Sequence, residues 1–186
     1  MSMSPENSKE AVIVAVPETA GSALYGMVDV LASAGRLWQQ LVGVEPESTL
    51  ISPKVASPIG HPFECGNGIP VKPDLDINDH PTADIVILPE MWLAPNEDLR
   101  GRYPDVMEWI RQRYRVGSSI YSACSGAIML AETGLLDGRK ATSHWGYQSL
   151  FRVSYPKVQF EPEPNLCFAD PSGRIVTAGG TSSWHD

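Results

Sequence analysis

Cys124 is the residue best placed to do chemistry in this chain, because it lies where a buried strand is expected to turn sharply into a helix. Ala123, Ser125 and Gly126 flank it, and a nucleophile elbow needs such small neighbours because strand and helix pass close together there. The thiol would face the positive end of the helix, which favours a thiolate. The sequence therefore predicts a candidate active or binding site around Cys124.

Catalysis by Cys124 would require a general base and an oxyanion hole. The best candidate for the base is His144, which would reach the same sheet edge from a short strand expected at 141–143. The backbone N–H of Ser125 would supply one oxyanion donor, and the turn after Leu88 would supply the second. Both side chains also have a purely structural interpretation, since a cysteine among apolar residues often only packs and a histidine often only bonds a carbonyl group.

The other cysteines and the tryptophans carry weaker signals. Cys65 and Cys167 are interpreted as packing residues, and the sequence holds no Cys-x-x-Cys and no histidine pair at metal-ligand spacing. Trp92 and Trp145 follow expected strand ends, so they could wall a pocket. We therefore expect neither a metal nor a cofactor.

The elements that must position these residues alternate between strand and helix. Short apolar runs rich in β-branched residues predict buried strands at 11–16, 84–88 and 118–123. Apolar residues at helical spacing predict helices at 22–35, from Pro104 onward, and at 125–133. Gly134 follows the last of these, at the usual position of a glycine that ends a helix. This alternation favours an α/β fold with a mostly parallel sheet, helices on both faces and ligands at the carboxyl ends of the strands.

Two further regions are less regular. Between 42 and 79 many prolines interrupt the pattern, and short strands are expected around 49–52 and 69–71. Nearer the end, segments 165–170 and 174–178 flank Pro-Ser-Gly, which predicts a hairpin.

Length and composition limit the possible function classes. With 186 residues, 42% of them apolar, the chain can bury one sizeable core, expected over 11–186 after a disordered tail at 1–10. The net charge of −8 would repel nucleic-acid phosphates, and no apolar run suggests a signal peptide or a membrane span. Three widely spaced cysteines fit reduced thiols in a cytoplasmic protein. Residues 181–186 look like a helix start, so we expect a helix, or a longer protein, to continue there.

One stretch of sequence carries a family resemblance. The run 122–145, which contains Cys124, His144 and the turn Gly-Leu-Leu-Asp-Gly-Arg between them, resembles the DJ-1/PfpI superfamily. More narrowly, it is similar to the amino-terminal, class I glutamine-amidotransferase-like domain of AraC-family transcription regulators. Thr-Ala-Gly-Gly-Thr-Ser at 177–182 is also typical of that family, and the resemblance extends over about 11–186.

The resemblance implies a flavodoxin-like three-layer sandwich, a homodimer, and a pocket for a small-molecule ligand at the elbow. In the regulator branch a long helix and a helix-turn-helix domain follow, so any contact with DNA would come through a domain missing from this chain. The residues expected to line the pocket beside Cys124 and His144 are Glu18, Ala23, Glu90, Met91, Trp92, Ser125, Trp145, Gly180 and Thr181.

Two departures from the family pattern bear on catalysis. Enzymes of the superfamily place a Glu or Asp on the first helix to bond the cysteine, and Ala23 stands at that position here. Glu18, five residues earlier, could substitute. The usual glycine pair after Leu-Pro is replaced by Glu90 and Met91, of which Met91 could still offer its N–H to an oxyanion. The Glu90 carboxylate would either disfavour a thiolate on Cys124 or take over the acid role.

These features support three functional hypotheses. The first is a sensory domain of an AraC-type regulator that binds a small, polar metabolite beside Cys124 and His144. The second is a cysteine-dependent enzyme with Cys124 as nucleophile and His144 as acid/base, for which the superfamily offers isonitrile hydratases, glyoxalase-like enzymes and peptidases as precedents. The third is a redox sensor, because an exposed thiolate at an elbow oxidises readily.

Overall fold

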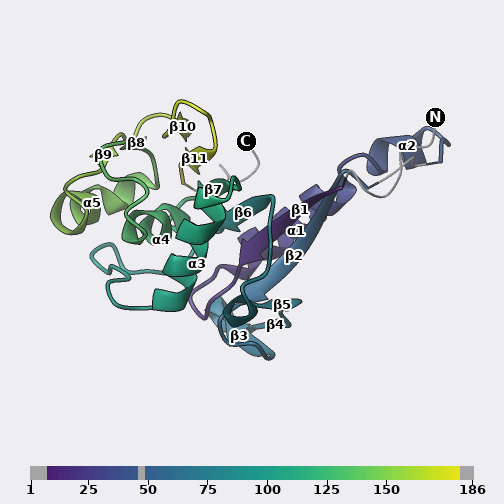
Figure 1. The fold of residues 1–186 in the computed structure, drawn as a ribbon, viewed down its shortest axis with the longest axis horizontal. Helices are drawn as coiled ribbons and strands as arrows, with labels where there is room; N and C mark the ends of the chain where they lie inside the picture. The colour runs from purple at the N-terminus through teal and green to yellow at the C-terminus, as the bar shows by residue number, and fades with distance from the viewer. Residues whose placement is uncertain (1–7, 46–48, 181–186) are drawn as a thin grey trace.

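A seven-stranded sheet forms the centre of the molecule, in a computed structural model that describes residues 8–45 and 49–180 (Figure 1). In spatial order its strands are β10 (Leu166–Phe168), β11 (Ile175–Ala178), β7 (Ser119–Ala123), β6 (Ile85–Leu88), β1 (Lys9–Val14), β2 (Ile51–Ser57) and β5 (Leu75–Asp76). All neighbouring pairs are parallel except β10 and β11. Two small sheets lie apart from it, β3 (Phe63–Cys65) with β4 (Ile69–Val71), and β8 (Lys140–Ala141) with β9 (Gln159–Phe160).

Helices cover both faces of the large sheet. The α-helices are α1 (Gly21–Ser33), α2 (Leu37–Leu41), α3 (Pro104–Arg115), α4 (Gly126–Glu132) and α5 (Gln148–Ser154). Single 3-10 turns occur at η2 (Gly66–Gly68), η3 (Ile77–Asp79) and η4 (Trp145–Tyr147). Because side chains alternate along a strand, Ile13 of β1 packs with Leu24 of α1 on one face, while Val12 joins Trp109 and Ile128 of α3 and α4 on the other. The predicted flavodoxin-like three-layer sandwich is confirmed.

The strongest sequence signals gave the correct elements. The three buried strands, the helix that starts at Pro104 and the hairpin of β10 and β11 are all present. Gly134 adopts a φ of +76° just after α4, as a glycine that ends a helix should. The first strand begins at Lys9, inside the segment expected to be a tail, because Lys9 and Glu10 pair with Ile51 and Ser52 of β2.

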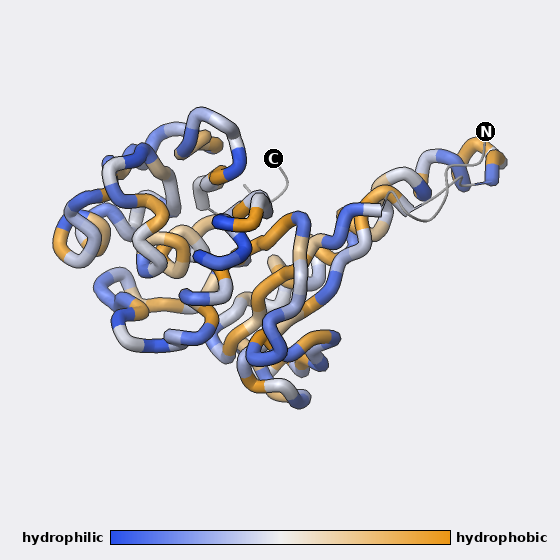
Figure 2. Tube along the Cα trace, in the orientation of Figure 1, coloured by the Kyte–Doolittle hydropathy of each residue, from blue (hydrophilic) through white to orange (hydrophobic). Residues whose placement is uncertain are grey.

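Other elements were missed or misplaced. The strand expected at 141–143 ends at Ala141 and pairs with β9 outside the large sheet, so it does not extend the site's sheet edge. The prolines of the irregular region also hid β3 and β5. Helices α2 and α5 are short, and α2 lies at the end of an arm that leads away from the sandwich (Figure 1). Apolar residues continue into this arm (Figure 2), and Trp38 is 71% exposed there.

On the face of the large sheet that α1 covers, an apolar hollow of about 430 Å³ lies beside this helix. Its walls include Met27 of α1, Tyr121 of β7, Phe168 of β10 and Val176 of β11. Phe168 is exposed on this surface. Within the described residues, α1 therefore covers only part of its face of the sheet.

The close approach of α4 to the end of β6 makes a stability prediction. A Cβ added to Gly126 would lie 2.1 Å from the Leu88 carbonyl oxygen and 2.8 Å from the Pro89 oxygen, and neither backbone group can move cheaply. We expect Gly126→Ala to lower the free energy of unfolding by about 3 kcal/mol in urea titrations. Gly134→Ala is the matched control, because its added Cβ meets nothing within 4 Å and adds only left-handed strain of about 1 kcal/mol. Equal losses in the two variants would contradict the predicted contact.

Candidate functional site

Cys124 lies at a strained turn directly after β7. Its φ is +52°, in the left-handed region that a cysteine rarely adopts. The turn is held because the Cys124 N–H donates to the carbonyl oxygens of Ala178 and Gly179 at 3.1 and 3.0 Å, and the Ser143 hydroxyl donates to the Cys124 carbonyl oxygen at 2.6 Å. A strain of about 1–3 kcal/mol persists only where surrounding contacts fix the backbone in this way. The backbone is that of a nucleophile elbow.

The side chain of Ser125 joins the elbow to the loop after β6. Its hydroxyl accepts a hydrogen bond from the Met91 N–H at 2.6 Å and donates one to the Met91 carbonyl oxygen at 2.7 Å. Ser125 is fully buried. The expectation that the Met91 N–H would be open to an oxyanion is therefore wrong, because the neighbouring serine hydroxyl occupies it.

Glu90 lies beside the thiol. Burial raises the pKa of the Glu90 carboxyl above its ordinary value, whereas a hydrogen bond with the Cys124 side chain and the nearby charge of His144 lower it. The Glu90 backbone is fixed as well, since its carbonyl oxygen accepts from the Ala20 N–H at 2.8 Å. An acid thus contacts the cysteine from the loop after β6, while Ala23 on α1 is buried in the core.

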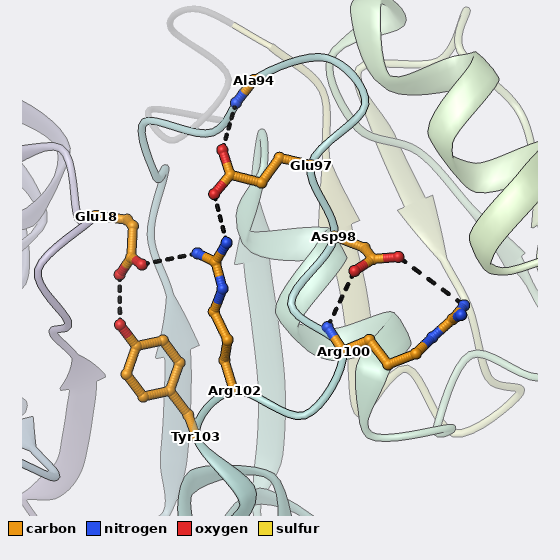
Figure 3. A network of polar contacts seen from close by, with 7 residues as sticks. All are labelled: Glu18, Ala94, Glu97, Asp98, Arg100, Arg102 and Tyr103. Atoms are coloured by element: carbon orange, nitrogen blue, oxygen red, sulfur yellow. Dashed lines mark hydrogen bonds and ion pairs between the residues drawn. The ribbon is translucent and has the colours of Figure 1, made fainter.

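Glu18 does not replace the missing acid of α1. One of its carboxylate oxygens accepts from Arg102 at 3.0 Å and the other from the Tyr103 hydroxyl at 2.6 Å (Figure 3). The idea that Glu18 substitutes as the cysteine's partner is therefore corrected, because both of its carboxylate oxygens are bonded to the two residues that directly precede α3.

His144 is held in one tautomer by its own turn. Its Nδ1 accepts from the Gly146 N–H at 3.0 Å, so a neutral ring carries its proton on Nε2. The ring packs against Trp145, with centroids 5.1 Å apart, and against Gly180, where an added Cβ would lie 2.2 Å from Cδ2. In this tautomer Nε2 presents an N–H rather than a lone pair, which suits donation to a ligand better than removal of a proton from a thiol.

The expected rim residues differ in their surroundings. Trp92 is 57% exposed and lies over Gly66, and Trp145 is 72% exposed. Thr181, also expected at the pocket, lies outside the described residues.

Tyr147 is a residue of the site that the sequence does not predict. Its hydroxyl donates to the Leu93 carbonyl oxygen at 2.9 Å. Burial is the main reason why the pKa of Tyr147 is raised, and the interaction with Cys124 raises it further. Its place three residues after His144, on the same face of a helical turn, was the only signal in the sequence.

The described residues contain neither a metal-binding cluster nor a membrane-spanning helix. No three His, Cys, Asp or Glu side chains gather there as ligands of a metal ion. In the same part of the chain, no helix combines the length and apolar character needed to cross a membrane.

Comparison with known proteins agrees with the elbow geometry. The DJ-1/PfpI family matches residues 11–184. The chain belongs to the DJ-1/PfpI family. A solved DJ-1/PfpI fold, Drosophila melanogaster DJ-1beta, superposes with a TM-score of 0.68 over 96% of this chain and 85% of its own, at 19% identity.

Curated relatives of this DJ-1/PfpI chain include both regulators and enzymes. The HTH-type transcriptional regulator CdhR of Pseudomonas aeruginosa is 35% identical over 69% of this chain and 36% of its own length. An isonitrile hydratase of Pseudomonas putida is 28% identical over 67% of this chain and 51% of its own length. The chain thus spans about a third to a half of the length of these relatives, one an HTH-type transcriptional regulator and one an isonitrile hydratase.

The Ser125 contact predicts a loss of stability. In Ser125→Ala the Met91 N–H would lose its buried partner, while the Met91 carbonyl oxygen would keep the bond from the Leu93 N–H. We therefore expect the free energy of unfolding to fall by about 1–3 kcal/mol. Chemical denaturation measures this loss. Ser22→Ala, on the exposed side of α1, should change stability by less than about 0.5 kcal/mol. A Ser125→Ala protein as stable as the Ser22→Ala control would show that the contact is not made.

The raised pKa of Glu90 predicts how stability depends on pH. Because the folded protein holds this proton more tightly than the unfolded chain, wild type loses stability as pH rises from 4.5 through the raised value. Glu90→Gln cannot ionise, so its stability relative to wild type should increase over that interval in denaturation curves at successive pH values.

Glu97→Gln is the control with the opposite sign. A hydrogen bond from the Ala94 N–H, and a second from Arg102, lower the pKa of Glu97, so its stabilising effect is present above 4.5 and is lost as pH falls through the lowered value. Relative to wild type, Glu97→Gln should therefore become less stable as pH rises through that range. The same slope in both variants would contradict the assigned environments.

Proposed function

We propose that this DJ-1/PfpI domain is the small-molecule-sensing part of an AraC-type transcription regulator in the cytoplasm. A small, polar metabolite binds beside Cys124 and His144, and its occupancy is passed to a DNA-binding domain elsewhere in the protein. The 35% identity to the regulator CdhR supports the regulatory class. A net charge of −8 makes it unfavourable for this domain to contact DNA itself.

The observation that carries the proposal is the capture of the Met91 N–H by the Ser125 hydroxyl. A cysteine enzyme of this class needs donors aimed at the charge that develops on its substrate, and such a donor contributes about 3 kcal/mol to catalysis. Here the Met91 N–H is already hydrogen-bonded to the Ser125 hydroxyl. The Glu90 carboxylate also faces the thiol, and a negative charge there disfavours a thiolate. The site retains polar groups for binding but lacks two features of a nucleophile site.

Sensing requires that the ligand bind two conformations with different affinity. The loop 89–103 is suited to this role, because it carries Glu90 and Met91 and connects β6 to α3. We further propose that the domain forms a homodimer, so that occupancy can also pass to a second copy.

A cysteine-dependent hydratase or hydrolase is the alternative, and one observation favours it. Glu90 bonds the Cys124 side chain, as the acid of the first helix does in the superfamily's enzymes, and an isonitrile hydratase is among the relatives. In this case Cys124 would be the nucleophile and Glu90 or His144 the acid/base.

A ligand screen separates the two functions. With a panel of small polar metabolites, we expect at least one to raise the melting temperature and to be recovered chemically unchanged. At a concentration of about 100 Kd the stabilisation is about 2.7 kcal/mol, or roughly 5–10 °C for a chain of this size. His144→Ala should lose the shift and Ser22→Ala should keep it. Consumption of the ligand, abolished in Cys124→Ser, would instead establish the enzyme.

A further inference from the structure

Glu18 contacts both ends of the loop that carries Glu90. At the beginning of the loop, the Glu18 carbonyl oxygen accepts from the Trp92 N–H at 2.7 Å. At its end, the Glu18 carboxylate accepts from Arg102 and from the Tyr103 hydroxyl (Figure 3). One residue of the β1–α1 connection therefore bonds two points of the loop, Trp92 and Arg102, that are ten residues apart in sequence.

The residues after Glu18, Thr19 and Ala20, contact the backbone of Glu90 and Met91 directly. Ala20 donates its N–H to the Glu90 carbonyl oxygen at 2.8 Å, and Thr19 forms an isolated antiparallel bridge with Met91. Together with the Trp92 contact to Glu18, these bonds align residues 90–92 as a short strand against residues 18–20. The position of the Glu90 side chain beside Cys124 thus depends on where residues 18–20 are held.

The carboxylate of Glu18 connects that segment to the start of α3, in addition to the hydrogen bonds that Thr19 makes with Val16 and Gly66. Its side chain is only 21% exposed, so its ion pair with Arg102 is partly shielded from solvent. Tyr103 has a φ of +51°, and its strained backbone is fixed by Pro104 on one side and by the hydroxyl bond to Glu18 on the other. Arg102 also pairs with Glu97 at 2.6 Å, but Glu97 bonds its own loop through Ala94 rather than residues 18–20.

We propose that Glu18 is a positioning residue that holds the Glu90 carboxylate beside the Cys124 thiol. The inference concerns the site of the proposed function, yet its test needs no ligand, so the two can fail separately. Its consequence is that removing the Glu18 carboxylate should make Cys124 behave as if Glu90 itself had been neutralised.

The readout is the alkylation rate of Cys124 by iodoacetamide at pH 7, divided by the rate of Cys167 in the same sample and measured by peptide mass spectrometry. Cys167 is a buried reference on β10, and global unfolding would raise both rates. In Glu90→Gln we expect the ratio to rise about three- to tenfold, because a negative charge no longer faces the thiol. In Glu18→Ala the ratio should rise by a similar factor, and in Glu97→Gln it should stay within about twofold of the wild-type ratio.

Arg102→Met separates positioning from a simple effect of charge. Removing a cation would slow alkylation if charge alone acted through space, whereas losing the hold on Glu18 should speed it. The double variant Glu18→Ala/Glu90→Gln should be no faster than Glu90→Gln alone, since both changes act through one carboxylate. If Glu18→Ala does not fold, Arg102→Met and Tyr103→Phe carry the test, each removing one partner of Glu18.

Several results would overturn the proposal. A wild-type ratio in Glu18→Ala beside a raised ratio in Glu90→Gln would show that Glu18 does not position the acid. An unchanged ratio in Glu90→Gln would remove the premise. Slower alkylation of Cys124 in Arg102→Met would assign the effect to charge acting through space. An increase in the double variant equal to the product of the two single increases would assign it to a general loosening of the structure.

Discussion

The pair of hydrogen bonds between the Ser125 hydroxyl and the backbone of Met91 is the contact on which the site depends. It joins the loop after β6 to the elbow after β7 at the carboxyl edge of the sheet. Gly126 adds a second close contact here, because a Cβ at this position would collide with the Leu88 carbonyl oxygen at the end of β6. Glu90, which precedes Met91 in the sequence, lies beside Cys124, and the Met91 N–H that catalysis would use as a donor is occupied.

The rest of the site can be understood from this constraint. In the proposed sensor, a thiol on a strained turn that faces a partly buried carboxylate would act as a polar surface for a ligand rather than as a nucleophile. His144 contributes an N–H in the tautomer set by Gly146, and Trp92 and Trp145 add exposed aromatic faces. In the proposed sensor, a ligand that reorders the loop 89–103 would shift the domain between two conformations, as sensing requires.

Local sequence signals predicted much of the fold and the position of the elbow. β-branched runs located the buried strands, Gly134 located a helix end, and the small residues around Cys124 located the elbow. Side-chain contacts between distant segments could not be predicted this way. The sequence suggests a role for the Ser125 N–H alone, although the Ser125 hydroxyl bonds a residue 34 positions away. It also suggests Glu18 as a substitute partner of Cys124, whereas its partner Arg102 lies 84 positions along the chain. Such pairings depend on loop geometry, which periodicity does not encode.

The ionisation state of Cys124 at pH 7 tests the central claim most directly. The difference in ultraviolet thiolate absorbance between the wild-type chain and Cys124→Ser isolates this thiol from Cys65 and Cys167. If the Cys124 thiol stays protonated beside the Glu90 carboxylate, the two proteins should have the same thiolate absorbance at pH 7 and differ only in alkaline solution. A full thiolate signal from Cys124 at pH 7 would contradict the account and favour the enzyme.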